Sequence, residues 1–142
     1  MKKILFLLLL PIINFAQSNI SNFWKNDSWY IDQIITRKSD SIYIFRIVKQ
    51  NSDRRKFIYG TFLDFNADGT FRTWNTAPCG NGCFFNSYGT FKKIDETHIQ
   101  LQINLFSQEG TCIPVTDTIR QNLGIFEIKP NEYGYQLIKT KN

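Results

Sequence analysis

Residues 97–105 alternate between polar and apolar side chains, and this alternation constrains the fold more than any other feature of the chain. Ile99, Leu101 and Ile103 occupy every second position, with polar residues between them. Successive side chains of a β-strand point to opposite faces, so the segment has one apolar and one polar face. The pattern predicts a half-buried strand of an antiparallel sheet.

Seven other segments also have strand-like patterns and are separated by short polar turns. The turns carry Gly, Asn, Asp and Pro, which tolerate or impose the backbone angles of tight turns. Their spacing and the sequential hairpins favour an all-β, antiparallel up-and-down barrel of about eight strands, since closure removes the exposed sheet edges. A short amphipathic helical turn is expected at residues 19–25. The predicted strands span residues 29–36, 42–49, 57–65, 70–74, 84–93, 97–105, 117–129 and 133–139.

The N-terminus has the layout of a secretory signal peptide. Lys2 and Lys3 precede an apolar run at residues 4–13, and Ala16 supplies a small residue at a plausible cleavage point. A run of about ten apolar residues is too short to span a bilayer, and no second run of spanning length follows. We expect cleavage after Ala16 and a secreted or periplasmic protein that does not span the membrane, with residues 17–142 as its single domain.

The excess of basic residues is small in the expected mature chain. The formal net charge is +5, and loss of Lys2 and Lys3 lowers it to +3. A charge of this size favours solubility over nucleic-acid binding, so no nucleic-acid partner is expected. Residues 42–48 are apolar on both faces, and one face needs cover from the N-terminal segment or from a second copy of the chain. A monomer and a homodimer are both left open.

Three cysteines, Cys79, Cys83 and Cys112, leave an odd thiol in a chain that is expected to be exported. In a meander, the connections at residues 75–83 and 106–116 lie at the same end of the barrel, two strand spacings or about 10 Å apart. A disulfide between Cys83 and Cys112 is favoured, with Cys79 as the alternate partner of Cys112 or as a free thiol. A local bond between Cys79 and Cys83 is the third option.

The same end of the predicted barrel carries a group of basic residues. Arg54, Arg55 and Lys56 lie in the connection that precedes the third predicted strand, and Trp74 ends the strand that leads to the cysteines. A solvated turn explains the basic residues adequately. The alternative is a basic rim that attracts an anionic ligand head group to the mouth of the barrel. These four residues are the candidates for a ligand-binding mouth.

One turn matches the opening of a calcium-binding loop. Asp64, Asn66 and Asp68 supply oxygen atoms at alternate positions, and Gly69 follows them as that loop requires. The glutamate expected at the twelfth position is replaced by Asn75, and the flanking segments are strand-like rather than helical. The sequence therefore favours a hairpin turn here, with weak calcium binding as the alternative.

His98 is the only histidine of the chain, and it lies on the polar face of its predicted strand. No Ser or Cys motif is placed to use it as a general base. A zinc or copper site that joins His98 to the cysteines is disfavoured, because His98 begins its strand near the opposite end of the barrel. We expect no catalytic activity, no cofactor and no metal centre.

Several short segments together resemble the small lipocalin-like proteins that bacteria export. They are the aromatic entry residues Trp24 and Trp29, the sequence FNADGTF at residues 65–71, YGTF at residues 88–91, and LIK at residues 137–139. The resemblance implies a lipocalin-like barrel that can hold a cavity. The expected function is binding of a small apolar or amphipathic ligand. The alternative is a structural or interaction module whose barrel is filled by its own side chains.

Overall fold

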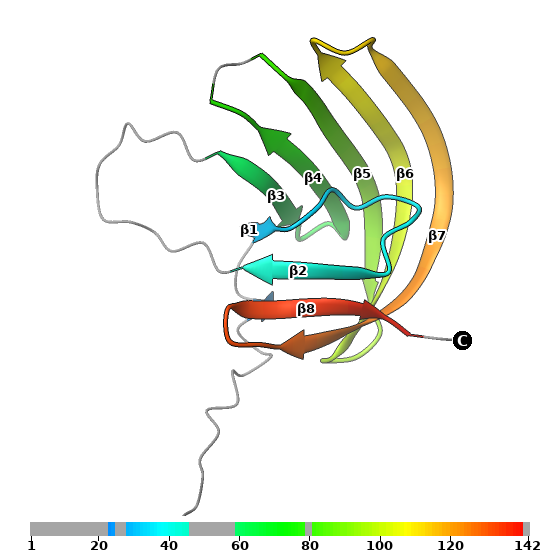
Figure 1. Ribbon diagram of the computed structural model, residues 1–142. Helices are drawn as coiled ribbons and strands as arrows, with labels where there is room; N and C mark the ends of the chain where they lie inside the picture. Colours follow the sequence, from blue (N-terminus) through cyan, green and yellow to red (C-terminus); the bar gives the residue numbers. More distant parts are fainter. Residues whose placement is uncertain (1–22, 25–27, 46–58, 79–80, 141–142) are drawn as a thin grey trace, which may run out of the picture.

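The computed structural model describes residues 23–24, 28–45, 59–78 and 81–140 (Figure 1). They form an all-β, closed antiparallel barrel of eight strands, as the sequence predicts. No helix within these described ranges is long and apolar enough to cross a membrane. The strands are β1 (Ser28–Ile31), β2 (Ser41–Phe45), β3 (Gly60–Phe65), β4 (Thr70–Thr76), β5 (Cys83–Lys93), β6 (His98–Gly110), β7 (Val115–Pro130) and β8 (Gly134–Lys139).

The order of strands around the barrel differs at one point from a simple meander. Strands β3 to β8 follow one another as antiparallel neighbours, but β1 lies between β2 and β3 and pairs with both. Tyr30 on β1 is opposite Phe45 on β2 and Phe62 on β3. As a result, the β1–β2 connection shares an end of the barrel with the β4–β5 and β6–β7 connections. A meander would place it at the other end.

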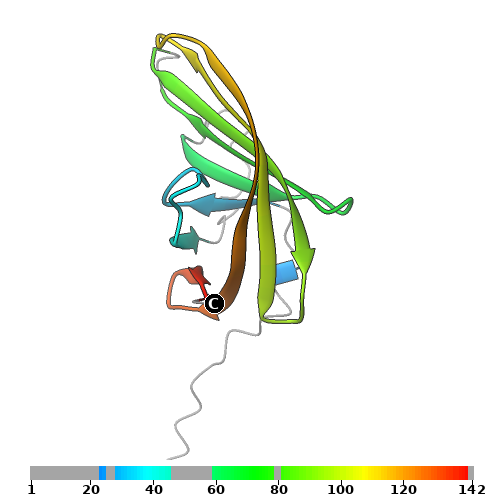
Figure 2. The same ribbon diagram turned by 90° about the vertical axis from the view of Figure 1, so that its right-hand side faces the viewer.

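The strands have unequal lengths, and three of them extend beyond the barrel. β5, β6 and β7 contain 11, 13 and 16 residues, whereas β1, β2 and β8 contain 4, 5 and 6. The long strands rise past the short ones toward the β6–β7 turn (Figures 1 and 2). We call this part the overhang and define it as residues 83–88, 104–110 and 115–121. One side of it faces back toward the β1–β2 connection.

The alternation that predicts β6 is confirmed by burial. Ile99, Leu101 and Ile103 have no exposed surface and point into the barrel. The opposite end from the overhang is filled by aromatic rings, with Phe23 stacked on Trp29 at 5.4 Å and edge-on to Tyr135 at 5.2 Å between ring centroids. Phe23 therefore packs inside the barrel, and does not cover the outer face of β2 as one reading of the sequence suggests. Trp24 beside it stacks on Phe91, while the other residues of the expected N-terminal helical turn and the signal segment lie outside the described residues.

Two β-bulges mark the level at which the barrel passes into the overhang. The register between β5 and β6 shifts between Tyr88 and Gly89, which leaves Asn104 on β6 without a partner on β5. The register between β6 and β7 shifts once between Leu101 and Gln102 and again between Ile103 and Leu105; the second shift is at the same level as the β5–β6 bulge, and Arg120 has a positive φ of 48° there. Bulges bend a strand and change the direction of its side chains. The overhang therefore curves away from the closed part of the barrel.

Candidate site: a pocket at the open end of the barrel

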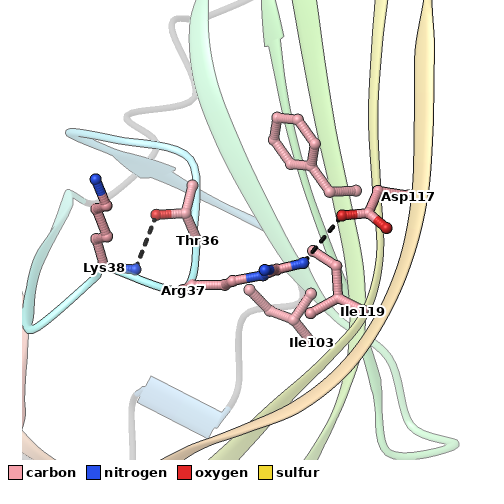
Figure 3. A pocket seen from close by; sticks show the side chains of 7 residues that line it. Thr36, Arg37, Lys38, Ile103, Asp117 and Ile119 are labelled. Carbon is pink, nitrogen blue, oxygen red and sulfur yellow. Dashed lines mark hydrogen bonds and ion pairs between the residues drawn. The ribbon is translucent and has the colours of Figure 1, made fainter.

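A pocket of about 270 Å³ lies between the β1–β2 connection and the inner face of β6 and β7 (Figure 3). Its floor is apolar and comes from the level of the two bulges and from the overhang. Its rim is polar and comes mainly from the β1–β2 connection. The lining residues are Ile103, Phe106 and Ile119 on the floor, and Thr36, Arg37, Lys38 and Asp117 on the rim.

The β1–β2 connection is held by one apolar anchor and a tight turn. Ile35 is fully buried and Ser39 is 2% exposed, so this connection packs into the end of the barrel. The Ser39 hydroxyl accepts a hydrogen bond from the Thr36 backbone N–H at 2.9 Å, and the Ser39 N–H donates to the Thr36 carbonyl at 3.2 Å. The turn between them presents Arg37 and Lys38 to the pocket.

An ion pair spans the rim of the pocket. The Arg37 guanidinium donates to the Asp117 carboxylate at 2.9 Å, which links residues 80 positions apart in sequence (Figure 3). Each side chain is 52% exposed. An ion pair this exposed is screened by water and contributes only about 0.2–1 kcal/mol to stability. Together with Lys38, the rim carries two positive charges and one negative charge above an apolar floor.

The floor of the pocket depends on the irregular part of the sheet. Ile103 and Phe106 are three positions apart, so a regular strand would point them to opposite faces. The bulge at Asn104 restores both side chains to the inner face, where they meet Ile119 of β7. The positive φ of Arg120 belongs to the matching irregularity on β7. The pocket floor therefore exists because the two strands break the regular alternation.

The disulfide between Cys83 and Cys112 is confirmed, with 5.2 Å between the two Cα atoms. It joins the first residue of β5 to the turn after β6, at the end of the overhang. The backbone supports the same contact, because the Thr111 N–H donates to the Gly82 carbonyl at 3.0 Å. Disulfides are typical of oxidising compartments. Cys79 lies outside the described residues.

Of the residues predicted for the ligand mouth, only Trp74 lies in the described part of the chain, and it does not line this pocket. Arg54, Arg55 and Lys56 lie outside the described residues. Trp74 is on the outer face of β4, where its ring stacks on Phe62 at 5.2 Å between centroids and the Arg72 guanidinium lies 4.9 Å above it. These contacts account for its half-buried position.

The turn that resembles a calcium loop is a hairpin between β3 and β4. The Asp68 carboxylate accepts hydrogen bonds from the Thr70 N–H at 2.9 Å and from the Thr70 hydroxyl at 2.6 Å, and these bonds lower the pKa of Asp68. Asn66 donates its side-chain amide to the Thr70 hydroxyl, and Asp64 accepts a bond from Ser28 on β1. Within the described part of the chain, no three His, Cys, Asp or Glu side chains cluster as metal ligands would.

His98 lies at the first position of β6, at the end opposite the pocket and the disulfide. Its Nδ1 atom is 3.0 Å from the Asp95 carboxylate in the β5–β6 turn. Hydrogen bonds from the Thr97 backbone and from His98 lower the pKa of Asp95 to about 2. The only histidine of the chain is therefore bound to the β5–β6 turn and is remote from the pocket.

Sequence reasoning missed the Arg37–Asp117 ion pair of the rim. Arg37 lies beside a predicted turn, and Asp117 begins a predicted strand, so neither stands out from its neighbours. The available signal was indirect: Phe106 is an apolar residue that is out of phase with the apolar residues 99, 101 and 103 of the same segment. Apolar residues out of phase indicate a bulge, and bulges often lie next to binding sites.

The fold and the pocket define a class: a closed, eight-stranded antiparallel barrel with an open pocket at one end. The architecture is consistent with a lipocalin-like fold. A scan against models of known protein families and searches of curated proteins and of solved structures find no match for this chain.

Proposed function

We propose that this protein binds a small amphipathic ligand in the pocket at the open end of its barrel. The observation that carries the proposal is the combination of an apolar floor, made by Ile103, Phe106 and Ile119, with a charged rim at Arg37 and Asp117. Ligand sites are concave and mostly apolar, with a few polar groups that orient the ligand, and the mouths of β-barrels are common places for them.

The size of the pocket limits the ligand. Sites for drug-sized molecules enclose about 300–1,000 Å³, and this pocket encloses about 270 Å³. The aromatic cluster around Phe23 and Trp29 fills the far end of the barrel, so the pocket does not continue into it. We therefore expect a compact ligand, such as a short alkyl chain that ends in a polar group.

We propose two further properties: the protein is not an enzyme, and it functions outside the cytoplasm. His98 supports the first point, because it is engaged with Asp95 at the end of the barrel away from the pocket. The Cys83–Cys112 disulfide supports the second, together with the signal-like segment that ends near Ala16.

A titration with octanol, followed by two-dimensional amide NMR of the protein, tests the pocket itself. We expect saturable shifts at Ile103, Phe106 and Ile119, and none in the β3–β4 turn. Replacing Phe106 with Ala removes part of the apolar floor. The affinity for octanol should fall about fivefold or more, because burial against an aromatic ring contributes to binding. Tyr43→Ala, on an outer position that is 44% exposed, is the matched control and should leave the affinity unchanged.

One specific observation favours the alternative of an interaction module without a ligand. The buried core of the barrel consists of the protein's own side chains, among them Trp29, Phe71 and Tyr135, each at most 1% exposed. In that case octanol would cause no saturable shifts at the pocket, and Phe106→Ala would change only stability. This result would reject the ligand-binding proposal.

A further inference from the structure

We propose that the pocket prefers anionic amphiphiles, with Arg37 binding the head group and Asp117 acting as a built-in competitor for that arginine. This inference rests on the proposed function and adds the charge of the ligand to it. Its basis is the geometry of the rim: a half-exposed guanidinium that is paired with a half-exposed carboxylate, directly above an apolar floor.

The charges on the rim favour an anion. Arg37 and Lys38 are positive and Asp117 is negative, while the residues of the floor carry no charge. A concave site with an excess of one charge concentrates ligands of the opposite sign. The apolar floor then holds the tail of such a ligand, because burial of alkyl surface is favourable wherever the head group stays on the rim.

Arg37 has the capacity to bind a second acceptor. A guanidinium carries five N–H donors in a planar fork, which matches the two oxygens of a carboxylate. In the part of the chain that the structure describes, one hydrogen bond of the Arg37 guanidinium goes to Asp117. More than half of the side chain is exposed, so a ligand carboxylate can reach the other donors without rearrangement of the loop.

Asp117 opposes an anionic ligand for two reasons. It already occupies one edge of the guanidinium, and its own negative charge repels a second carboxylate at the same place. Exposed ion pairs contribute little to stability, so a ligand can replace this one at small cost. Removal of the Asp117 charge should therefore raise the affinity for anionic ligands and leave that for neutral ligands unchanged. Removal of the Arg37 charge should abolish the preference for anionic ligands.

Octanoate and octanol differ in the charge of the head group and share the length of the chain, so their affinities separate the two parts of the site. The affinities are measured by calorimetry at pH 7 and low ionic strength for the wild type, Arg37→Gln and Asp117→Asn. An ion pair at the opposite end of β7 from Asp117 provides matched controls: Lys129 and Glu127, whose charged groups are 3.3 Å apart, are replaced in Lys129→Gln and Glu127→Gln.

We expect the wild type to bind octanoate more tightly than octanol. Arg37→Gln should reduce octanoate affinity about two- to fivefold, the range that an exposed ion pair supports, with little effect on octanol. Asp117→Asn should raise octanoate affinity by a similar factor, again with little effect on octanol. The two control variants should leave the ratio of octanoate affinity to octanol affinity unchanged. Added salt should reduce this ratio for the wild type.

Two different failures are distinguishable. If both rim variants change octanoate and octanol by the same factor, Arg37 and Asp117 only fasten the loop, and the anion preference is rejected while the pocket remains a binding site. If wild-type protein binds neither probe, the proposed function itself is rejected. A loss of affinity for octanoate in Asp117→Asn would also overturn the inference, because it reverses the expected sign.

Discussion

Removal of the Cys83–Cys112 disulfide should destabilise the protein by an amount that its place in the sequence determines. The two cysteines are 29 positions apart. For a loop of that length, the loss of chain entropy in the unfolded state corresponds to about 3.5 kcal/mol at 25 °C. Both side chains are only partly buried, so their replacement removes little packing from the core. The entropic contribution should therefore account for nearly the whole effect.

The assay is urea unfolding of the double variant Cys83→Ser, Cys112→Ser against its parent. Both proteins also carry Cys79→Ala, so that the third thiol does not exchange with the bond. We expect a loss of about 3–4 kcal/mol and a melting temperature lower by about 14 °C for a domain of this size. The denaturant slope should rise slightly, because the uncrosslinked chain exposes more surface when it unfolds. A loss below about 1 kcal/mol would refute the reasoning, since it would mean that the unfolded chain keeps the β5–β6 hairpin without the bond.

Two further outcomes follow from local geometry. A Cβ atom on Gly89 would lie 2.1 Å from the Gln102 carbonyl oxygen, so Gly89→Ala should lower the free energy of unfolding in urea by about 2–3 kcal/mol. Gly82→Ala is the control: the atom nearest to its Cβ would be 3.9 Å away, and the loss should be less than about 0.5 kcal/mol. Equal losses in the two variants would contradict the expected clash. The pKa of Asp95 is lowered to about 2, so its carboxylate stabilises the fold above its ordinary pKa of 3.8 and loses that effect as the pH falls through 2. The stability difference between wild type and Asp95→Asn should therefore shrink between pH 5 and pH 2, and a difference that is constant over this range would show that the carboxylate's charge does not matter.

The barrel itself could be predicted because its strands follow local rules where the core is regular. In β6, Ile99, Leu101 and Ile103 keep strict alternation, and the polar turn at residues 66–69 marks the hairpin between β3 and β4. The Cys83–Cys112 bond could be favoured because the order of strands places both residues at one end of the barrel. These features depend on residues that are close in sequence, or on the rule that the connections between consecutive antiparallel strands alternate between the two ends of the barrel.

The rest depends on contacts that the alternation does not encode. The predicted strand at residues 97–105 continues in the structure to Gly110, and the strand predicted at residues 117–129 begins at Val115. These additional residues lie in the overhang, where both faces of the strands are partly exposed and a strict alternation of polar and apolar side chains is not required. β1 lies between β2 and β3, and this position depends on tertiary packing because β1 and β2 are too short to determine their neighbours by local pattern. Because that exchange moves the β1–β2 connection to the other end, the contact of Arg37 with Asp117 could not be foreseen.

The overhang divides the molecule into two regions of unequal local stability. In the closed barrel, Leu101 and Phe126 are fully buried, but residues 115–118 of β7 are exposed, and β8 pairs with β7 only from Phe126 onward. Amide groups in the overhang should therefore exchange with solvent through local opening, at a lower free energy than global unfolding. The pocket floor lies at the border between these two regions. A bound ligand should thus be detectable as slower amide exchange in β7 from Val115 to Arg120, even where it changes the average structure very little.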